Sequence, residues 1–241
     1  SDLHTEYFEK GLPKLDGVTF RIMPENAARV AAIESGSVDL VWNLPLESID
    51  KLKESKVLTV DSVATSTWDG IVMGNKTKPF DDVRVRRAVL LALDKQQLAT
   101  FAAFGHGAPT HSPISPKHPY FNKQIGFKPD IAQAKKLLAD AGYPKGFQLT
   151  LHGSNGRYLN DAKITQALGQ MFVRAGISTT VETLPRAVYG TRGNDFGFSV
   201  GLFGWGTDTG EAASPLKSLI MTDRKSTRLN SSHVKRSRMP S

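Results

Sequence analysis

The sequence predicts an α/β fold, a mixed sheet flanked by helices, and three observations support this prediction. Segments with the alternating apolar pattern of strands and segments with the 3.6-residue period of helices follow one another several times along the chain. Strands that alternate with crossover helices favour a largely parallel sheet. Extra strand-like segments in the N-terminal half indicate that some neighbours pair differently, which makes the sheet mixed.

The expected elements follow from periodicity and from the residues that begin and end helices. Asn26 is expected to cap one helix and Gly36 to end it, Pro45 opens the next, and Asp94 is expected to cap a short helix. Strands are predicted at 18–22, 38–42, 57–63, 68–73, 147–151, 177–184 and 198–203. Helices are predicted at 27–35, 46–55, 83–94, 95–103, 131–141, 161–175 and 187–192. A long loop rich in Pro is predicted at 104–129.

The composition excludes several classes of protein. The chain has 241 residues, 39% of them hydrophobic, and no Cys, so disulfides, thiolate chemistry and Cys-ligated zinc are excluded. No apolar run reaches the roughly 18 residues that a membrane helix needs. The N-terminal residues show no basic region followed by an apolar stretch, so no signal peptide is visible. The sequence does not begin with Met, and the chain is therefore expected to be a fragment.

The positive charge is concentrated in the last residues. Of the formal net charge of +8, residues 223–241 carry +5, with six Lys or Arg and one Asp. A basic tail can bind nucleic acid. However, this segment has almost no apolar residues, and it resembles the in-frame translation of a sequencing adaptor. We therefore expect a folded domain over 1–222, a disordered non-native tail over 223–241, and no nucleic-acid partner.

Motifs of metal and catalytic sites are not found. His106, His111 and His118 lie in a Pro-rich loop without a neighbouring acid, which favours surface histidines, and His152 adds no ligand spacing. The chain contains no HExxH, GxSxG or GxxxxGK[ST] pattern. The paired acids Asp81 and Asp82 are explained by the beginning of a helix. No metal, no cofactor and no enzymatic activity are predicted.

Two loops that follow strands are candidates for a ligand site. In open α/β sheets, ligands bind beyond the carboxyl ends of strands. The first loop, 153–160, carries Arg157, whose planar guanidinium suits a carboxylate. The second, 204–210, carries Trp205 and Asp208, which could wall the site and pair with an ammonium. From the residues alone it is equally possible that Arg157 and Asp208 are solvated or paired with each other, and that Trp205 belongs to the core.

Four segments resemble the family 5 extracellular solute-binding proteins of bacterial ABC importers. They are GVTFRIMPENAARVAAIESGSVDLVWNLP, NKTKPFDDVRVRRAVLLALDKQQL, KKLLADAGYPKGFQLTLHGSNGRY and GLFGWGTDTGE, in the order of the family. KPFDDVRVRRAV is the most specific part. The resemblance implies a two-lobed, type II-like periplasmic-binding-protein fold about twice this length, of which the chain is the carboxyl-side lobe. It also implies an export signal, and a periplasmic or lipid-anchored extracytoplasmic location.

The resemblance also implies roles for particular residues. In dipeptide-binding relatives, an Arg in the loop matching NGRY anchors the ligand carboxylate, here Arg157, and an Asp in the loop matching GWGTDTG anchors the ammonium, here Asp208. Trp205 belongs to the same motif, and the neighbouring Tyr158 and Gly206 complete the expected ligand-binding set. After this loop, residues 211–215 depart from the Asp-Pro-Asp of many relatives.

The implied function is capture of a solute for import. The departure at 211–215 leaves peptide, nickel, glutathione and haem open as ligands, although a pair of opposite charges favours short peptides or another small zwitterion. The expected partners are such a solute and a membrane permease, and the protein is expected to be a monomer. Two other classes stay open: a ligand-sensing effector domain of a transcriptional regulator with the same fold, and a periplasmic hydrolase.

Overall fold

The computed structural model of the protein describes residues 8–12, 14–63, 65, 67–112, 114, 121–122, 126–194, 197–206, 213 and 216. The basic tail 223–241 lies outside the described residues. The chain divides into two compact units, residues 1–44 and 45–241. The first unit contains helix α1 (Asn26–Glu34), and the second contains the four strands of the described residues.

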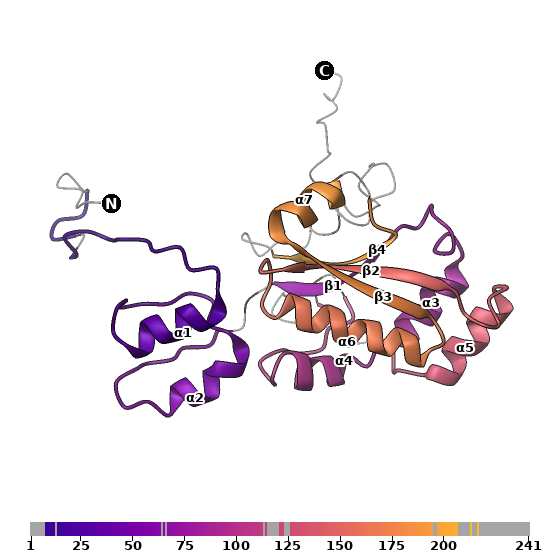
Figure 1. The fold of residues 1–241 in the computed structure, drawn as a ribbon, viewed down its shortest axis with the longest axis horizontal. Helices are drawn as coiled ribbons and strands as arrows, with labels where there is room; N and C mark the ends of the chain where they lie inside the picture. Colours follow the sequence, from indigo (N-terminus) through magenta and orange to yellow (C-terminus); the bar gives the residue numbers. More distant parts are fainter. Residues whose placement is uncertain are drawn as a thin grey trace, which may run out of the picture. The chain divides into compact units, whose positions relative to one another are not determined.

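The second unit is built on a four-stranded sheet in the order β1-β4-β2-β3 (Figure 1). The strands are β1 (Trp68–Met73), β2 (Gln148–Asn155), β3 (Ser178–Pro185) and β4 (Val200–Trp205). β2 runs parallel to β3 and to β4, whereas β1 runs antiparallel to β4. The predicted mixed α/β sheet is therefore confirmed. Because β1 is antiparallel, its first residue pairs with the last residue of β4, and β1 begins where β2 and β4 end.

Helices cover both faces of this sheet. α6 (Asp161–Arg174) connects β2 to β3 and packs on one face, and α7 (Arg186–Asn194) lies on the opposite face (Figure 1). α3 (Val83–Leu91) packs against α5 (Ile131–Asp140). Shorter helical segments are η1 (Leu46–Ser48), α2 (Ile49–Lys53), α4 (Lys95–Gln97) and the π-helical turn η2 (Leu98–Ala102). The fully buried side chains of the core include those of Phe80, Val85, Leu138, Leu151, Phe172 and Leu202.

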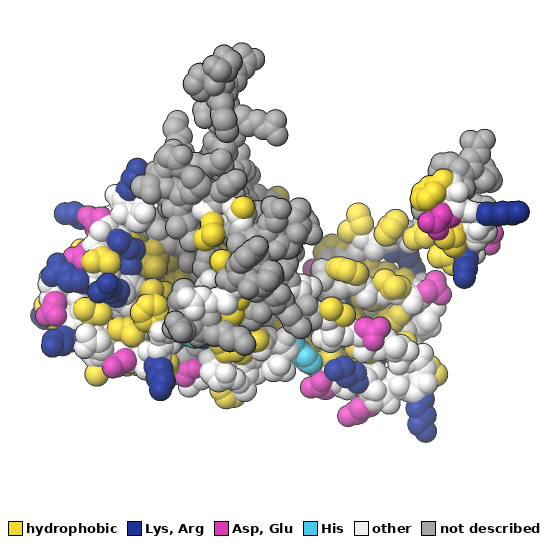
Figure 2. Space-filling model, turned by 180° about the vertical axis from the view of Figure 1, so that it is seen from behind, with side chains coloured by type: hydrophobic (Ala, Val, Ile, Leu, Met, Phe, Trp, Pro, Cys, Tyr) yellow, Lys and Arg dark blue, Asp and Glu magenta, His cyan; other side chains and the backbone are white. Residues whose placement is uncertain are grey.

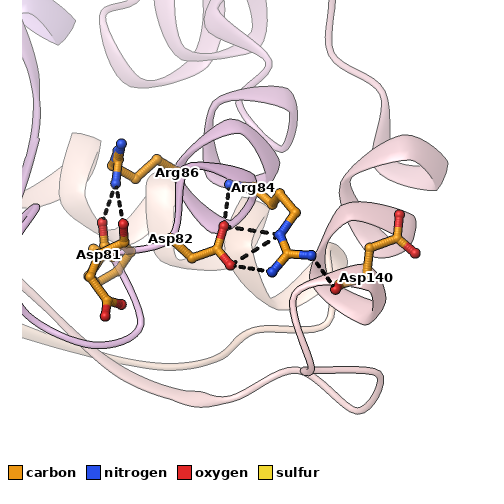
Figure 3. A network of polar contacts seen from close by, with 6 residues as sticks. Asp81, Asp82, Arg84, Arg86 and Asp140 are labelled. Carbon is orange, nitrogen blue, oxygen red and sulfur yellow. Dashed lines mark hydrogen bonds and ion pairs between the residues drawn. The ribbon is translucent and has the colours of Figure 1, made fainter.

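The KPFDDVRVRRAV segment has a structural explanation (Figure 3). The carboxylate of Asp82 caps α3 by accepting from the Arg84 amide at 2.7 Å, and the Arg84 guanidinium returns to the same carboxylate at 2.6 Å. These bonds from Arg84 lower the pKa of Asp82. Arg84 also donates to the carbonyl oxygen of Asp140, which ties α3 to α5. The predicted capping role is confirmed for Asp82, whereas Asp81 contributes its carbonyl oxygen to Arg86.

Other predicted helix ends agree with the structure with one exception. Asp94 caps α4 with its side chain as predicted, and Gly36 follows α1 with a left-handed φ of 68°. Asp130, which was not predicted as a cap, caps α5. The exception is Asn26, which is the first residue of α1 and follows the cap residue Glu25. The helices predicted from sequence are thus present, with boundaries moved by a few residues.

Three predicted strands do not form in the described part of the chain. Residues 18–22, 38–42 and 57–63 belong to no strand. Several of their apolar side chains are at the surface, with Phe20 85%, Ile22 93% and Trp42 79% exposed. Figure 2 shows hydrophobic side chains at the surface of the N-terminal unit. A strand needs a neighbour for its backbone hydrogen bonds, and these segments pair with none of the described strands.

None of the helices in the described part of the chain is long and apolar enough to cross a membrane.

Candidate ligand-binding site

The loop after β2 is held by one buried carboxylate. Asp161, the first residue of α6, is 3% exposed, and its carboxylate accepts hydrogen bonds from the loop that precedes the helix. The donors are the hydroxyl of Ser154 at 2.8 Å and the backbone amides of Gly156, Arg157, Tyr158 and Ala162 at 3.1, 2.9, 3.1 and 2.9 Å. A carboxylate with this many donors fixes the loop conformation, and an acid at a helix N-terminus also suits the helix dipole.

This loop presents Arg157 and Tyr158 at the ends of the strands. Arg157 is exposed, and its guanidinium carbon lies 5.2 Å from the centre of the Tyr158 ring, a cation–π arrangement. The Tyr158 hydroxyl donates to the carbonyl oxygen of Gly204 at 3.3 Å, which joins the loop to the end of β4. The guanidinium of Arg157 interacts with the Tyr158 hydroxyl, and its exposure leaves it accessible to an anion.

The end of β4 supplies the second part of the site. Trp205 is the last residue of β4, it is partly buried, and its ring lies 5.9 Å from that of Phe203. Gly206 follows at the surface. Asp208, predicted as the second anchor, lies outside the described residues. The structure thus brings Arg157 and Tyr158 to the same edge as Trp205, and it leaves the prediction for Asp208 untested.

Sequence reasoning missed Asp69, which lies at the same edge. Asp69 pairs in register with Gly204, and a Cβ on Gly204 would lie 2.5 Å from its Oδ1 and 2.6 Å from the Tyr158 ring. Asp69 is an exposed residue, although the protein atoms around its carboxylate bury part of that group. This burial, with the negative charge of Asp161 as a smaller cause, raises the pKa of Asp69 to about 6. Only the antiparallel pairing of β1 with β4, which no local pattern reveals, brings Asp69 here.

Helix α7 lies against the other side of the Arg157 loop. The Tyr189 hydroxyl is buried and donates to the carbonyl oxygen of Leu202 in β4. Burial is the main cause that raises the pKa of Tyr189, so its hydroxyl stays protonated. An Arg157 guanidinium nitrogen lies 4.0 Å from where a Cβ on Gly190 would be. We call Asp69, Arg157, Tyr158, Gly204 and Trp205 the strand-end surface.

Comparison with known proteins now assigns the family. Residues 3–226 match the family model described as bacterial extracellular solute-binding proteins, family 5 Middle. The chain belongs to this family. The resemblance seen in the sequence is thereby confirmed.

Relatives of this solute-binding chain agree with that assignment. The glutathione-binding protein GsiB of Pectobacterium atrosepticum is 30% identical over 221 residues, which cover 90% of the chain and 43% of the relative. The periplasmic binding protein DppA of Helicobacter pylori, solved with the peptide STSA, superposes with a TM-score of 0.75 at 23% identity, over 81% of the chain and 38% of DppA. AgaA of A. tumefaciens R10, solved with agropinic acid, gives 0.79 at 23% identity, over 93% and 46%.

These comparisons confirm the predicted periplasmic-binding-protein fold of this family 5 chain. They also show that the chain spans less than half the length of the relatives it matches.

The histidines of this family member are mostly structural. His152 is 6% exposed, stacks on Phe198 with ring centres 4.3 Å apart, and lies 3.0 Å from the Glu182 carboxylate, which also binds Arg192 at 2.8 Å. Burial is the main cause that lowers the pKa of His152. It is a core residue that ties β2 to β3 and α7.

The predicted loop histidines differ from one another. The His106 ring lies 3.7 Å from the Asp50 carboxylate and is largely buried, so a surface position is wrong for it. His111 accepts from the Phe127 amide and lies 3.1 Å from the Lys95 amine. His118 lies outside the described residues. Among the described residues, no group of three or more His, Asp or Glu side chains is arranged to hold a metal ion.

Proposed function

We propose that this chain is the carboxyl-side lobe of the substrate-binding component of an ABC importer, and that it captures short peptides outside the inner membrane. Family membership supports a solute-binding role. The relatives named for glutathione and the neighbour solved with the peptide STSA support a peptide ligand. Both ligands carry an amine and carboxylates, which opposite charges on a protein can bind.

The observation that carries this proposal is the presentation of Arg157. Its backbone is fixed by the Asp161 carboxylate, and its guanidinium is exposed beside Tyr158 at the ends of the strands. A guanidinium that is held in place can donate two parallel hydrogen bonds to a carboxylate at little entropic cost. Such a charge-assisted contact contributes about 1.5–3 kcal/mol. Arg157 is the proposed anchor of the peptide carboxylate.

The remaining predicted residues and partners are part of the same proposal. Asp208 is proposed to contact the ligand ammonium, with Trp205, Tyr158 and Gly206 around the ligand. Residues 1–222 would form the lobe, and 223–241 a non-native tail. The complete protein would be a periplasmic or lipid-anchored monomer that delivers its ligand to a membrane permease. A second lobe would close over the ligand, exclude water and thereby strengthen both charge contacts, so the mechanism is a shift between open and closed states without covalent chemistry.

The test is calorimetric binding with the protein that carries both lobes. Glutathione and alanylalanine are titrated into the wild type, Arg157→Ala and the matched control Arg174→Ala, which removes an arginine at the opposite end of α6. We expect Arg157→Ala to weaken peptide binding about 10- to 100-fold and Arg174→Ala to leave it unchanged. Wild-type protein that binds neither peptide would contradict the ligand class. Equal affinity of Arg157→Ala and wild type would remove Arg157 from the site.

A further inference from the structure

Asp69 is the one carboxylate of the strand-end surface that the described residues leave without a partner. No hydrogen bond or ion pair joins it to any described side chain or amide. The carboxylate of Asp161 and the ring of Tyr158 are its electrostatic neighbours, and no cation of the described residues forms an ion pair with it. The Asp69 carboxylate therefore forms no hydrogen bond or ion pair with a described residue that would stabilise the fold.

The backbone opposite Asp69 is shaped around its carboxylate. Gly204, its register partner in β4, has no room for a side chain, because the Asp69 carboxylate and the Tyr158 ring already lie over its Cα. Asp69 and Arg157 thus lie near the same aromatic ring, the acid at the end of β4 and the guanidinium 5.2 Å from the ring centre. Opposite charges near one ring can bind the two ends of a zwitterion.

The negative charge of Asp69 also makes the folded state less stable. A carboxyl group whose folded-state pKa lies above its unfolded value of 3.8 makes the folded state less stable at neutral pH, because burial and Asp161 disfavour the ionised form. Residues that destabilise the fold are typical of functional sites. An asparagine would fit the same space without this cost.

We propose that Asp69 is a specificity-determining residue, which binds the ammonium group of the ligand while Arg157 binds its carboxylate. The inference rests on the proposed function and deepens it. It makes a primary amine a requirement of the ligand. It also gives the ammonium an acid from the beginning of β1, in addition to the predicted Asp208.

The experiment is a cycle that changes one group on the protein and one on the ligand. Alanylalanine and lactoyl-alanine, in which a hydroxyl replaces the ammonium, are titrated into wild type and Asp69→Asn of the protein with both lobes. Wild type should bind alanylalanine at least about 10-fold more tightly than lactoyl-alanine, and Asp69→Asn should remove most of that preference without a loss of melting temperature. The matched control Asp140→Asn, at the exposed end of α5, should keep the preference.

The outcomes separate this inference from the proposed function. If wild type binds neither compound, the peptide ligand itself is contradicted. If wild type prefers alanylalanine and Asp69→Asn retains the preference, the role of Asp69 is overturned and the proposed function stands. An equal loss of both compounds in Asp69→Asn would also overturn it, since that result marks a structural role. The same cycle with Asp208→Asn tests that acid separately.

Discussion

Two acids lie close together at the strand ends, and their surroundings are opposite. The carboxylate at the beginning of α6, Asp161, is buried and accepts five hydrogen bonds. The carboxylate at the beginning of β1, Asp69, keeps access to solvent and has no hydrogen-bond partner among the described residues. The first is satisfied by its own chain, whereas the second is not.

This difference separates positioning from binding. A buried acid with a full set of donors stabilises one loop conformation and has no capacity left for a ligand. An acid without hydrogen-bond donors around it can still bind a ligand, and a cation of the ligand would supply the missing partner. The comparison therefore predicts that the two residues respond in opposite ways to substitution, and the following experiments test that contrast.

The largest expected effect is the loss of Asp161. Asp161→Ala leaves several amides of the 154–162 loop without an acceptor, and we expect the free energy of unfolding to fall by about 3 kcal/mol or more. Asp161→Asn keeps one acceptor oxygen and should lose less. Urea unfolding at neutral pH measures both. An Asp161→Ala protein as stable as Asp140→Ala would show that the hydrogen bonds of this carboxylate contribute little.

The second effect tests the packing of Asp69 and Tyr158 against Gly204. Gly204→Ala places a Cβ against the Asp69 carboxylate and the Tyr158 ring, and should cost about 1–3 kcal/mol of stability because one of them must move. Combining it with Asp69→Ala should restore part of the loss, since one clash is then removed. Thermal unfolding of the single and double variants measures this coupling, and additive losses would contradict the contact.

The helices of this fold could be predicted from the sequence because their signals are local. Asp82, Asp94 and Asp130 cap helices within a few residues of their own position, and the apolar period of α6 is satisfied by one sheet face. The strands predicted at 18–22, 38–42 and 57–63 are wrong, because alternation indicates a strand only where a neighbouring strand exists. None of the described strands pairs with them.

The residues of the candidate site also divide into those that local sequence patterns reveal and those that depend on strand pairing. Arg157 follows β2 and Trp205 ends β4, so the rule that ligands bind beyond strand ends found them. Tyr158 and Gly206 came only with the family motif. Asp69 was missed because it begins a strand, and only the antiparallel direction of β1 turns that beginning toward the edge where β2 and β4 end.

A third, smaller effect is the pH dependence of ligand binding. The pKa of Asp69 is about 6, so its carboxyl group takes up a proton as the pH falls through that value. Affinity for alanylalanine should therefore decrease between about pH 7 and pH 5, by up to about 10-fold, because a neutral acid attracts an ammonium weakly. Calorimetry across this range should show a flatter profile for Asp69→Asn. Parallel profiles of the two proteins would assign the pH dependence to another group, with Asp161 the facing acid to examine first.

The smallest expected effect concerns Glu182, an acid with fewer hydrogen-bond partners than Asp161 and more than Asp69. Glu182 is satisfied by cations, and the hydrogen bond from Arg192 is the largest cause that lowers its pKa, with His152 adding a smaller contribution. Because burial lowers the pKa of His152 below its usual 6.5, the unfolded chain takes up a proton at that position first as the pH falls. The contribution of neutral His152 to stability is thus fully present above pH 6.5 and is lost as the pH falls below it.

This sign gives a direct measurement. The stability of the wild type should decline more between pH 7 and pH 5 than that of His152→Gln, which cannot take up a proton, and the two urea-unfolding curves should converge at acidic pH. His106→Gln is the matched control, because the His106 ring lies near the Asp50 carboxylate and no contact joins it to Glu182 or Arg192 among the described residues. Equal declines in wild type and His152→Gln would mean that the Glu182 carboxylate compensates the buried imidazolium fully. In that case a partly exposed acid that is bonded to Arg192 stabilises its histidine neighbour at every pH tested.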